Sequence, residues 1–76
     1  MLTLDQLKNG DRAVVKEVVS KGAGLIRRLA QLGVAPGALI EVVFNSGIGP
    51  VVVRVHGAEI AIGRGLARKV LVEVVE

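Results

Sequence analysis

The feature that most constrains the fold is a single stretch of helical periodicity among several short β-branched runs. Residues 23–32 hold leucines spaced four and three positions apart, which brings them onto one face of a helix. A parallel sheet needs a crossover connection, usually a helix, between neighbouring strands, and one helix cannot supply a series of them. The chain therefore predicts an all-β fold, a small five-stranded barrel with one α-helix inserted between strands 1 and 2.

The predicted helix has a well-marked apolar face and a well-marked end. Its apolar face consists of Leu25, Leu29 and Leu32. Gly33 stands where a left-handed C-terminal cap belongs, and Val34 can close back on Leu29 as the accompanying apolar contact. Pro36 and Gly37 then fit the two central positions of a type II turn, since proline presets φ and glycine accepts a positive φ. These residues define a helix followed by a corner that starts the second strand.

Five β-branched runs predict the strands, at residues 12–19, 40–44, 51–55, 60–62 and 70–75. The imperfect alternation of the first run indicates a bulge or a second partly covered face. His56 and Gly57 form a two-residue connection that suits a hairpin turn and places Arg54 directly across from Glu59. The glycine-rich residues 45–50 lack the Lys-Ser/Thr ending and the following helix of a phosphate-binding loop, so they predict a flexible hairpin connection.

The composition limits both the location and the partners of the chain. It is 51% hydrophobic, which compensates for the small core of a 76-residue domain, and it has no cysteine for a disulfide or thiolate site. No apolar run approaches the roughly 20 residues that span a bilayer, and the N-terminus lacks the layout of a signal peptide. We therefore expect one cytoplasmic domain over residues 1–76, without membrane insertion. The net charge of +3 is mild and Phe44 is the only aromatic residue, so no nucleic-acid partner is expected.

Few residues offer catalytic or metal-binding chemistry. The hydroxyl residues and the single histidine show no spacing that links a nucleophile to a base, so we expect no enzyme activity. His56 is a weak candidate metal ligand, because Glu41, Glu59 and Glu73 lie on predicted strands that could approach it. The alternative is a turn residue beside Gly57 that tolerates an unusual φ. We expect no cofactor, with weak transition-metal binding left open.

Basic and polar side chains gather in two places that offer a partner-binding surface. They are Arg27, Arg28 and Gln31 on the helix, and Arg64, Arg68 and Lys69 before the last strand. Each group is either a solvated face or a docking surface for an acidic protein, to which arginine offers forked donors. A barrel this small also cannot bury both faces of its valine-rich strands. Exposed β-branched residues favour self-association, as a homo-oligomer, or a protein partner.

Four segments carry a resemblance to a known family. They are LDQLKNGDRAVVKEV, IRRLAQLGVAPGALIEVV, GPVVVRVHGAEIAI and ARKVLVE, which together extend from Leu4 to Glu73. The chain resembles the FeoA family of small ferrous iron transport proteins, and the second segment is the most specific of the four. The resemblance implies an SH3-like barrel with an inserted helix and a non-enzymatic, cytoplasmic accessory role. It also implies a partner, the cytosolic part of the membrane permease FeoB.

The chain departs from the family pattern in two places. Ala58 follows the hairpin glycine where family members often carry an aromatic residue. Residues 63–69 read GRGLARK, which is more basic and richer in glycine than the usual segment before the last strand.

Two other functions are consistent with parts of the sequence. NGDRAVVKEV resembles the Gly-Asp-x-Val opening of KOW-type barrels, which implies an RNA- or ribosome-associated small β-barrel. His56 with nearby carboxylates would suit a metal-sensing SH3-like module. A steep fall of binding with added salt is the mark of the first, and loss of metal binding on removal of the His56 imidazole is the mark of the second.

Overall fold

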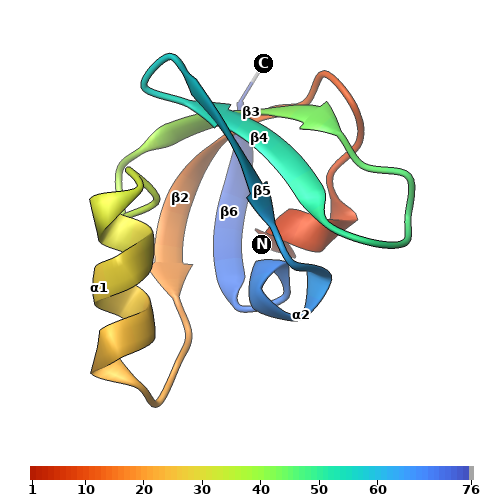
Figure 1. Ribbon diagram of the computed structural model, residues 1–76. Helices are drawn as coiled ribbons and strands as arrows, with labels where there is room; N and C mark the ends of the chain where they lie inside the picture. Colours follow the sequence, from red (N-terminus) through yellow and green to blue (C-terminus); the bar gives the residue numbers. More distant parts are fainter. Residues whose placement is uncertain (76) are drawn as a thin grey trace.

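Six antiparallel strands curve around one apolar interior in the computed structural model, which describes residues 1–75 (Figure 1). In chain order the elements are β1 (Leu2–Thr3), the 3₁₀ helix η1 (Leu4–Gln6), β2 (Arg12–Val18), α1 (Ala23–Gln31), β3 (Leu39–Phe44), β4 (Val51–Val55), β5 (Ala58–Ile62), α2 (Arg64–Ala67) and β6 (Val70–Val75). The strands form one sheet in the order β1-β6-β2-β3-β4-β5, so that β1 and β5 are its two ends. Within residues 1–75, no helix is long and apolar enough to cross a membrane.

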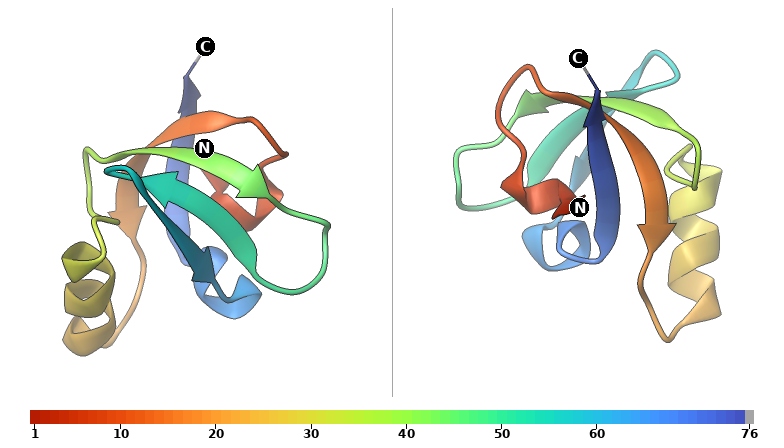
Figure 2. Two further views of the ribbon diagram at one scale, coloured as in Figure 1. Left: turned by 45° about the horizontal axis from the view of Figure 1, so that its top comes forward. Right: turned by 180° about the vertical axis from the view of Figure 1, so that it is seen from behind.

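The predicted all-β class, with a helix inserted between the first two longer strands, is confirmed. α1 lies outside the sheet beside β2, and α2 crosses one end of the barrel between β5 and β6 (Figure 1, Figure 2). The strand that sequence patterns missed is β1, whose two residues pair with Val72 and Leu71 of β6. A pairing this short leaves no periodic pattern to read. Residues 63–69, the basic and glycine-rich segment before the last strand, contain α2.

The interior is filled from one side of each longer strand. Val15, Val42, Val53 and Val72 are buried, whereas Ile60 on β5 is only half-buried. The valines at alternate positions of these strands are half-buried: Val14, Val43, Val52 and Val75. The register of β2 on β6 shifts just after Val15, which confirms the bulge indicated by the imperfect alternation. The outer face of the sheet therefore keeps part of its apolar surface.

α1 ends in a turn that closes it onto the barrel. Gly33 adopts a φ of +95° and donates its N–H to the Ala30 carbonyl at 2.9 Å, while Val34 donates its N–H to the Leu29 carbonyl at 2.8 Å. These two hydrogen bonds form the Schellman motif, and Leu29 and Val34 are both buried in the core as its apolar pair. The predicted left-handed cap is confirmed.

The prediction of a three-leucine apolar face is only partly right. Leu29 is buried and Leu25 is half-buried, but Leu32 is 47% exposed. Leu32 is the residue that caps the helix, and the turn at Gly33 directs Val34 into the core in its place. A spacing of i, i+4 and i+7 defines a common helix face, but not how much of that face the barrel covers.

The corner after the helix is the predicted type II turn. Gly37, which follows Pro36, has a φ of +93°, and Ala38 donates its N–H to the Ala35 carbonyl at 3.0 Å. Gly37 also donates its N–H to the Val15 carbonyl at 2.8 Å, so the corner is bound directly to β2. The turn thereby places the start of β3 beside the strand with which it pairs.

The hairpin between β4 and β5 is also as predicted. His56 and Gly57 have φ values of +50° and +80°, the two positive angles of a type I′ turn. Arg54 lies opposite Glu59 in the ladder, with its Nη2 2.7 Å from Glu59 Oε2. The turn-residue interpretation of His56 fits this geometry.

Replacing Gly33 by alanine should destabilise the fold more than replacing Gly37. Both residues have nearly the same positive φ, so each change carries a similar conformational cost of about 1–2 kcal/mol. A Cβ at Gly37 would meet open space, whereas a Cβ at Gly33 would lie 2.6 Å from His56 Cδ2 and 3.3 Å from Val55 Cγ2. We expect Gly33→Ala to lower the free energy of unfolding by about 1 kcal/mol more than Gly37→Ala, as measured by urea denaturation. Equal losses would mean that the His56 ring moves aside without cost.

Candidate functional site

The outer face of α1 presents two exposed arginines. A helix turns by about 100° per residue, so Arg27 and Gln31 lie nearly opposite the buried Leu29 and Arg28 lies at the flank. All three predicted residues of this group are exposed. α1 contains no acidic residue, and neither arginine takes part in a salt bridge within residues 1–75. Arg28 lies in the last turn, where the helix dipole favours a cation.

The second predicted group, which precedes β6, does not form one surface. Arg64 is half-buried, and its guanidinium is bound by oxygens of η1 and of the β3–β4 loop. Arg68 is exposed, with its Nε 3.9 Å from the Asp5 carboxylate. Lys69 is exposed and lines a cavity with residues that precede α1. Of the three, only Lys69 lies near the helix that carries the first group.

Asn45 and Arg64 join the β3–β4 loop to η1 and α2. The Asn45 side-chain amide donates to the carbonyls of Asp5 at 3.0 Å and Leu7 at 2.6 Å. The Arg64 guanidinium donates to the Gly49 carbonyl at 3.0 Å, to the Asp5 carbonyl at 3.3 Å and to the Asn45 side-chain oxygen. Residues 45–50, predicted as a flexible connection, are thus tied to two other elements. The sequence carries no sign of this, because the residues that Arg64 bonds to lie 15 to 59 positions away along the chain.

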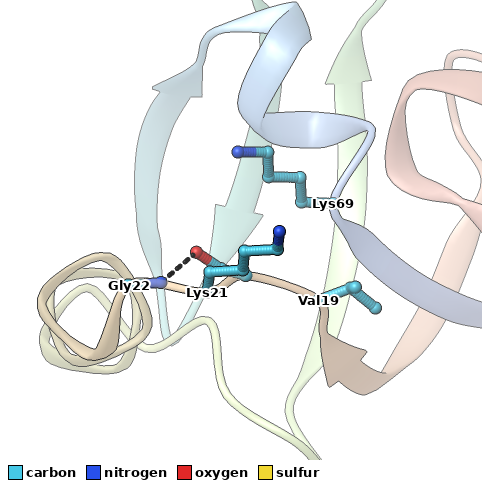
Figure 3. Close-up of a pocket in the computed structure, with 5 residues that line it drawn as sticks. Val19, Lys21, Gly22 and Lys69 are labelled. Carbon is cyan, nitrogen blue, oxygen red and sulfur yellow. Dashed lines mark hydrogen bonds between the residues drawn. The ribbon is translucent and has the colours of Figure 1, made fainter.

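A surface cavity of about 500 Å³ lies where the chain passes from β2 into α1 (Figure 3). Lys21 and Lys69 point toward the same opening, and Val19, Ser20 and Gly22 complete the lining. Ser20 Oγ accepts the Gly22 N–H at 3.1 Å, which holds the segment that leads into the helix. Neither lysine takes part in a salt bridge within residues 1–75. The cavity therefore extends the positive surface of α1 toward β6, through a residue, Lys21, that stands outside both predicted groups.

His56 is exposed at the β4–β5 turn and lies against the backbone of Gly33. Two of the carboxylates proposed as its neighbours instead bind Arg54, Glu41 at 3.2 Å and Glu59 at 2.7 Å. The hydrogen bond and the charge of Glu59, with a smaller contribution from Glu41, raise the pKa of the Arg54 guanidinium above its ordinary value. Among residues 1–75, no three or more histidine, aspartate or glutamate side chains gather as a metal site requires.

The FeoA domain model matches residues 2–74, which is nearly the whole chain. The chain belongs to the FeoA family. It is 40% identical over 73 residues to a protein of Methanocaldococcus jannaschii assigned as an Fe(2+) transport protein A, and the match covers 96% of this chain and 87% of the relative.

Solved FeoA structures share the fold. The crystal structure of an iron uptake regulatory protein, FeoA, has a TM-score of 0.91 at 32% identity, covering 97% of each chain. FeoA of Stenotrophomonas maltophilia, solved in complex with zinc and described as a prokaryotic SH3 domain protein, has a TM-score of 0.82 at 30% identity, covering 96% of this chain and 91% of that one. The SH3-like fold implied by the resemblance is thereby confirmed, as is membership of a ferrous iron transport family.

Arg64 should act as a structural residue of this FeoA-family chain. Arg64→Ala removes the three hydrogen bonds that the guanidinium donates to η1 and to the β3–β4 loop, so we expect the free energy of unfolding to fall by about 1–3 kcal/mol. Arg64→Lys should recover only part of this loss, because an ammonium lacks the planar fork. Arg68→Ala is the matched control and should change stability by less than about 0.5 kcal/mol. Urea denaturation measures all three variants, and equal losses at the two arginines would contradict the assignment.

Proposed function

We propose that this FeoA-family chain is a non-catalytic, cytoplasmic accessory protein of ferrous iron transport. Its action is binding to the cytosolic part of a FeoB-like membrane permease. The observation that carries the proposal is the outer face of α1, where Arg27 and Arg28 are exposed and have no ionic partner within residues 1–75. Family membership supplies the transport context.

The local chemistry of the hydroxyl residues supports a non-catalytic role. Thr3 Oγ1 donates to Asp5 Oδ1 at 2.5 Å, Ser46 Oγ donates to the Ile48 carbonyl at 2.9 Å, and Ser20 Oγ accepts the Gly22 N–H at 3.1 Å. The two serine hydroxyls bond to backbone groups of their own turns, and the Thr3 hydroxyl bonds to a carboxylate two residues along the chain, at the start of η1. The exposed His56 is not among these hydrogen-bond partners.

The α1 face combines charge with apolar surface in the way that protein interfaces do. Ile26 is 37% exposed and Leu32 is 47% exposed, and helix geometry places them on the two edges of the arginine-bearing face. Guanidinium groups bind carboxylates through two parallel hydrogen bonds, which fixes orientation as well as charge. The nine residues of α1 extend only about 14 Å, so this contact is of the small, transient kind. An acidic helix or loop of the permease is the partner of matching chemistry.

Reversing the charge of the face should abolish docking without unfolding the domain. We expect Arg27→Glu/Arg28→Glu to weaken binding to the soluble cytosolic domain of the permease by about tenfold or more, since two attractive contacts become repulsive. Binding is measured by nuclear magnetic resonance titration of the labelled chain. For the wild type, the largest amide shifts should lie in α1, and binding should weaken as salt rises from about 50 to 300 mM.

The matched control is Lys8→Glu/Arg12→Glu, which makes the same change of net charge at two exposed residues. Lys8 belongs to the loop before β2, which lies away from α1 in the views of Figure 1 and Figure 2, and Arg12 is the first residue of β2. The control should bind within about twofold of the wild type, because only the long-range attraction changes. An equal loss of affinity in both double variants would show that net charge alone accounts for the effect. If Arg27→Glu/Arg28→Glu bound the permease domain as tightly as the wild type, α1 would not be part of the interface.

A further inference from the structure

β5 is a free edge of the sheet. Its five residues pair with β4 on one side, from Ala58 opposite Val55 to Ile62 opposite Val51. It stands at the end of the strand order, and no backbone hydrogen bond among residues 1–75 reaches its other side. In Figure 1 it runs along the front of the molecule with β4 as its only neighbouring strand. A strand in this position offers unpaired N–H and C=O groups to another strand.

The turn before β5 determines which residues carry those groups. A two-residue type I′ turn makes its flanking pair, Val55 and Ala58, a hydrogen-bonded pair of the ladder. Hydrogen-bonded and non-hydrogen-bonded pairs then alternate along an antiparallel ladder. Ala58, Ile60 and Ile62 therefore direct their backbone groups toward β4. Glu59 and Ala61 direct theirs to the open side.

β5 lacks the features with which exposed edges usually prevent pairing. It contains no proline, no lysine and no register shift against β4. Its single charged residue is Glu59, whose carboxylate is bound by Arg54 on the neighbouring strand at 2.7 Å. Glu59 and Ala61 are exposed, so the open side is accessible.

We propose that this edge binds the same edge of a second copy of the chain, antiparallel, with the two-fold axis at Ile60. In this register Glu59 of each copy lies opposite Ala61 of the other, and each of these pairs exchanges both of its outward hydrogen bonds. All five residues of β5 find a partner in β5 of the second copy. Ile60, half-buried in one copy, lies opposite Ile60 of the other as a close, non-hydrogen-bonded pair.

The self-complementary arrangement of β5 is what favours a second copy over an unrelated strand. The neighbouring symmetric register that centres on Glu59 would place two carboxylates directly opposite each other, which is unfavourable. The register that centres on Ala61 would draw Gly63, the residue before α2, into the ladder opposite Glu59. Only the register that centres on Ile60 pairs the whole strand and sets each acid opposite a neutral residue. An isologous contact of this kind closes as a dimer.

Two substitutions at Ala61 should change the dimer in opposite directions. Ala61→Lys sets a lysine opposite Glu59 across both halves of the interface, and Ala61→Glu sets a second carboxylate there. We expect the dimer dissociation constant to fall by about 2- to 30-fold for Ala61→Lys and to rise by a similar factor for Ala61→Glu. Sedimentation velocity over a concentration series measures both variants. Weakening by both substitutions would overturn the proposed register, as would a wild type that stays monomeric up to about 1 mM.

Amide hydrogen exchange tests the pairing without any substitution. The amides of Ala58, Ile60 and Ile62 should be protected at every concentration, because they bond to β4. Protection of the Glu59 and Ala61 amides should rise with protein concentration in step with the dimer fraction. Exchange at those two amides that does not depend on concentration would overturn the proposal.

Proline at residue 61 removes the outward N–H while leaving the hydrogen bonds to β4 in place. We expect Ala61→Pro to abolish the dimer and Ala61→Ser, which keeps the N–H, to retain it, with circular dichroism confirming that both are folded. A folded Ala61→Pro that still dimerises would overturn the proposal. If the Glu59 and Ala61 amides became protected only when the cytosolic domain of the permease is added, the partner of β5 would be a strand of the permease and the proposed dimer would be wrong.

Discussion

The Schellman turn at Gly33 is the contact on which the position of the proposed docking face depends. Leu29 is the one buried residue of α1, so the helix is attached to the barrel through a narrow strip of apolar surface. Burial of one leucine stabilises by only about 1.5–3 kcal/mol and does not by itself fix the rotation of a helix. The hydrogen bonds of Gly33 and Val34 fix the rotation of the helix about its axis, because Val34 enters the core at the end of the same turn. With Leu29 and Val34 both inside, Arg27 has to face outward.

The arginines of this chain differ in role according to the groups that their side chains contact. Arg54 lies between two carboxylates on the outer face of the sheet, and its charge is used within the ladder. Arg64 gives its donors to backbone and amide oxygens of two other segments and so serves the fold. Arg27 and Arg28 have no such partners within residues 1–75. Unlike Arg54 and Arg64, these two arginines offer their full hydrogen-bonding capacity to another molecule.

Much of the fold could be predicted from the sequence because its turns are local. Gly33, Gly37 and the His56–Gly57 pair each require a positive φ, and the residues around them supply the remaining signals within a few positions. The Asn45–Arg64 network could not be predicted, since it joins residues from three separate parts of the chain. The exposure of Leu32 was missed for a related reason, as periodicity identifies a helix face but not the area that the barrel covers. Within the candidate site, helix periodicity was enough to place Arg27, Arg28 and Gln31 on the outer face of α1. That Arg64 and Lys69 lie on different surfaces became clear only from the structure.

The two proposed surfaces are physically adjacent through His56. Its ring lies against Gly33 at the end of α1, and the turn that it forms with Gly57 leads directly into β5. The absence of a side chain at Gly33 is what lets the helix end and the hairpin turn approach so closely. A dimer through β5 would therefore hold two α1 faces in a fixed relation set by the two-fold axis. Two weak arginine-bearing faces held in this way would bind a partner with two acidic sites far more tightly than one face, without any additional contact. A small transient interface and a paired strand edge are thus compatible parts of one binding mode, in which dimerisation supplies the affinity that a nine-residue helix lacks.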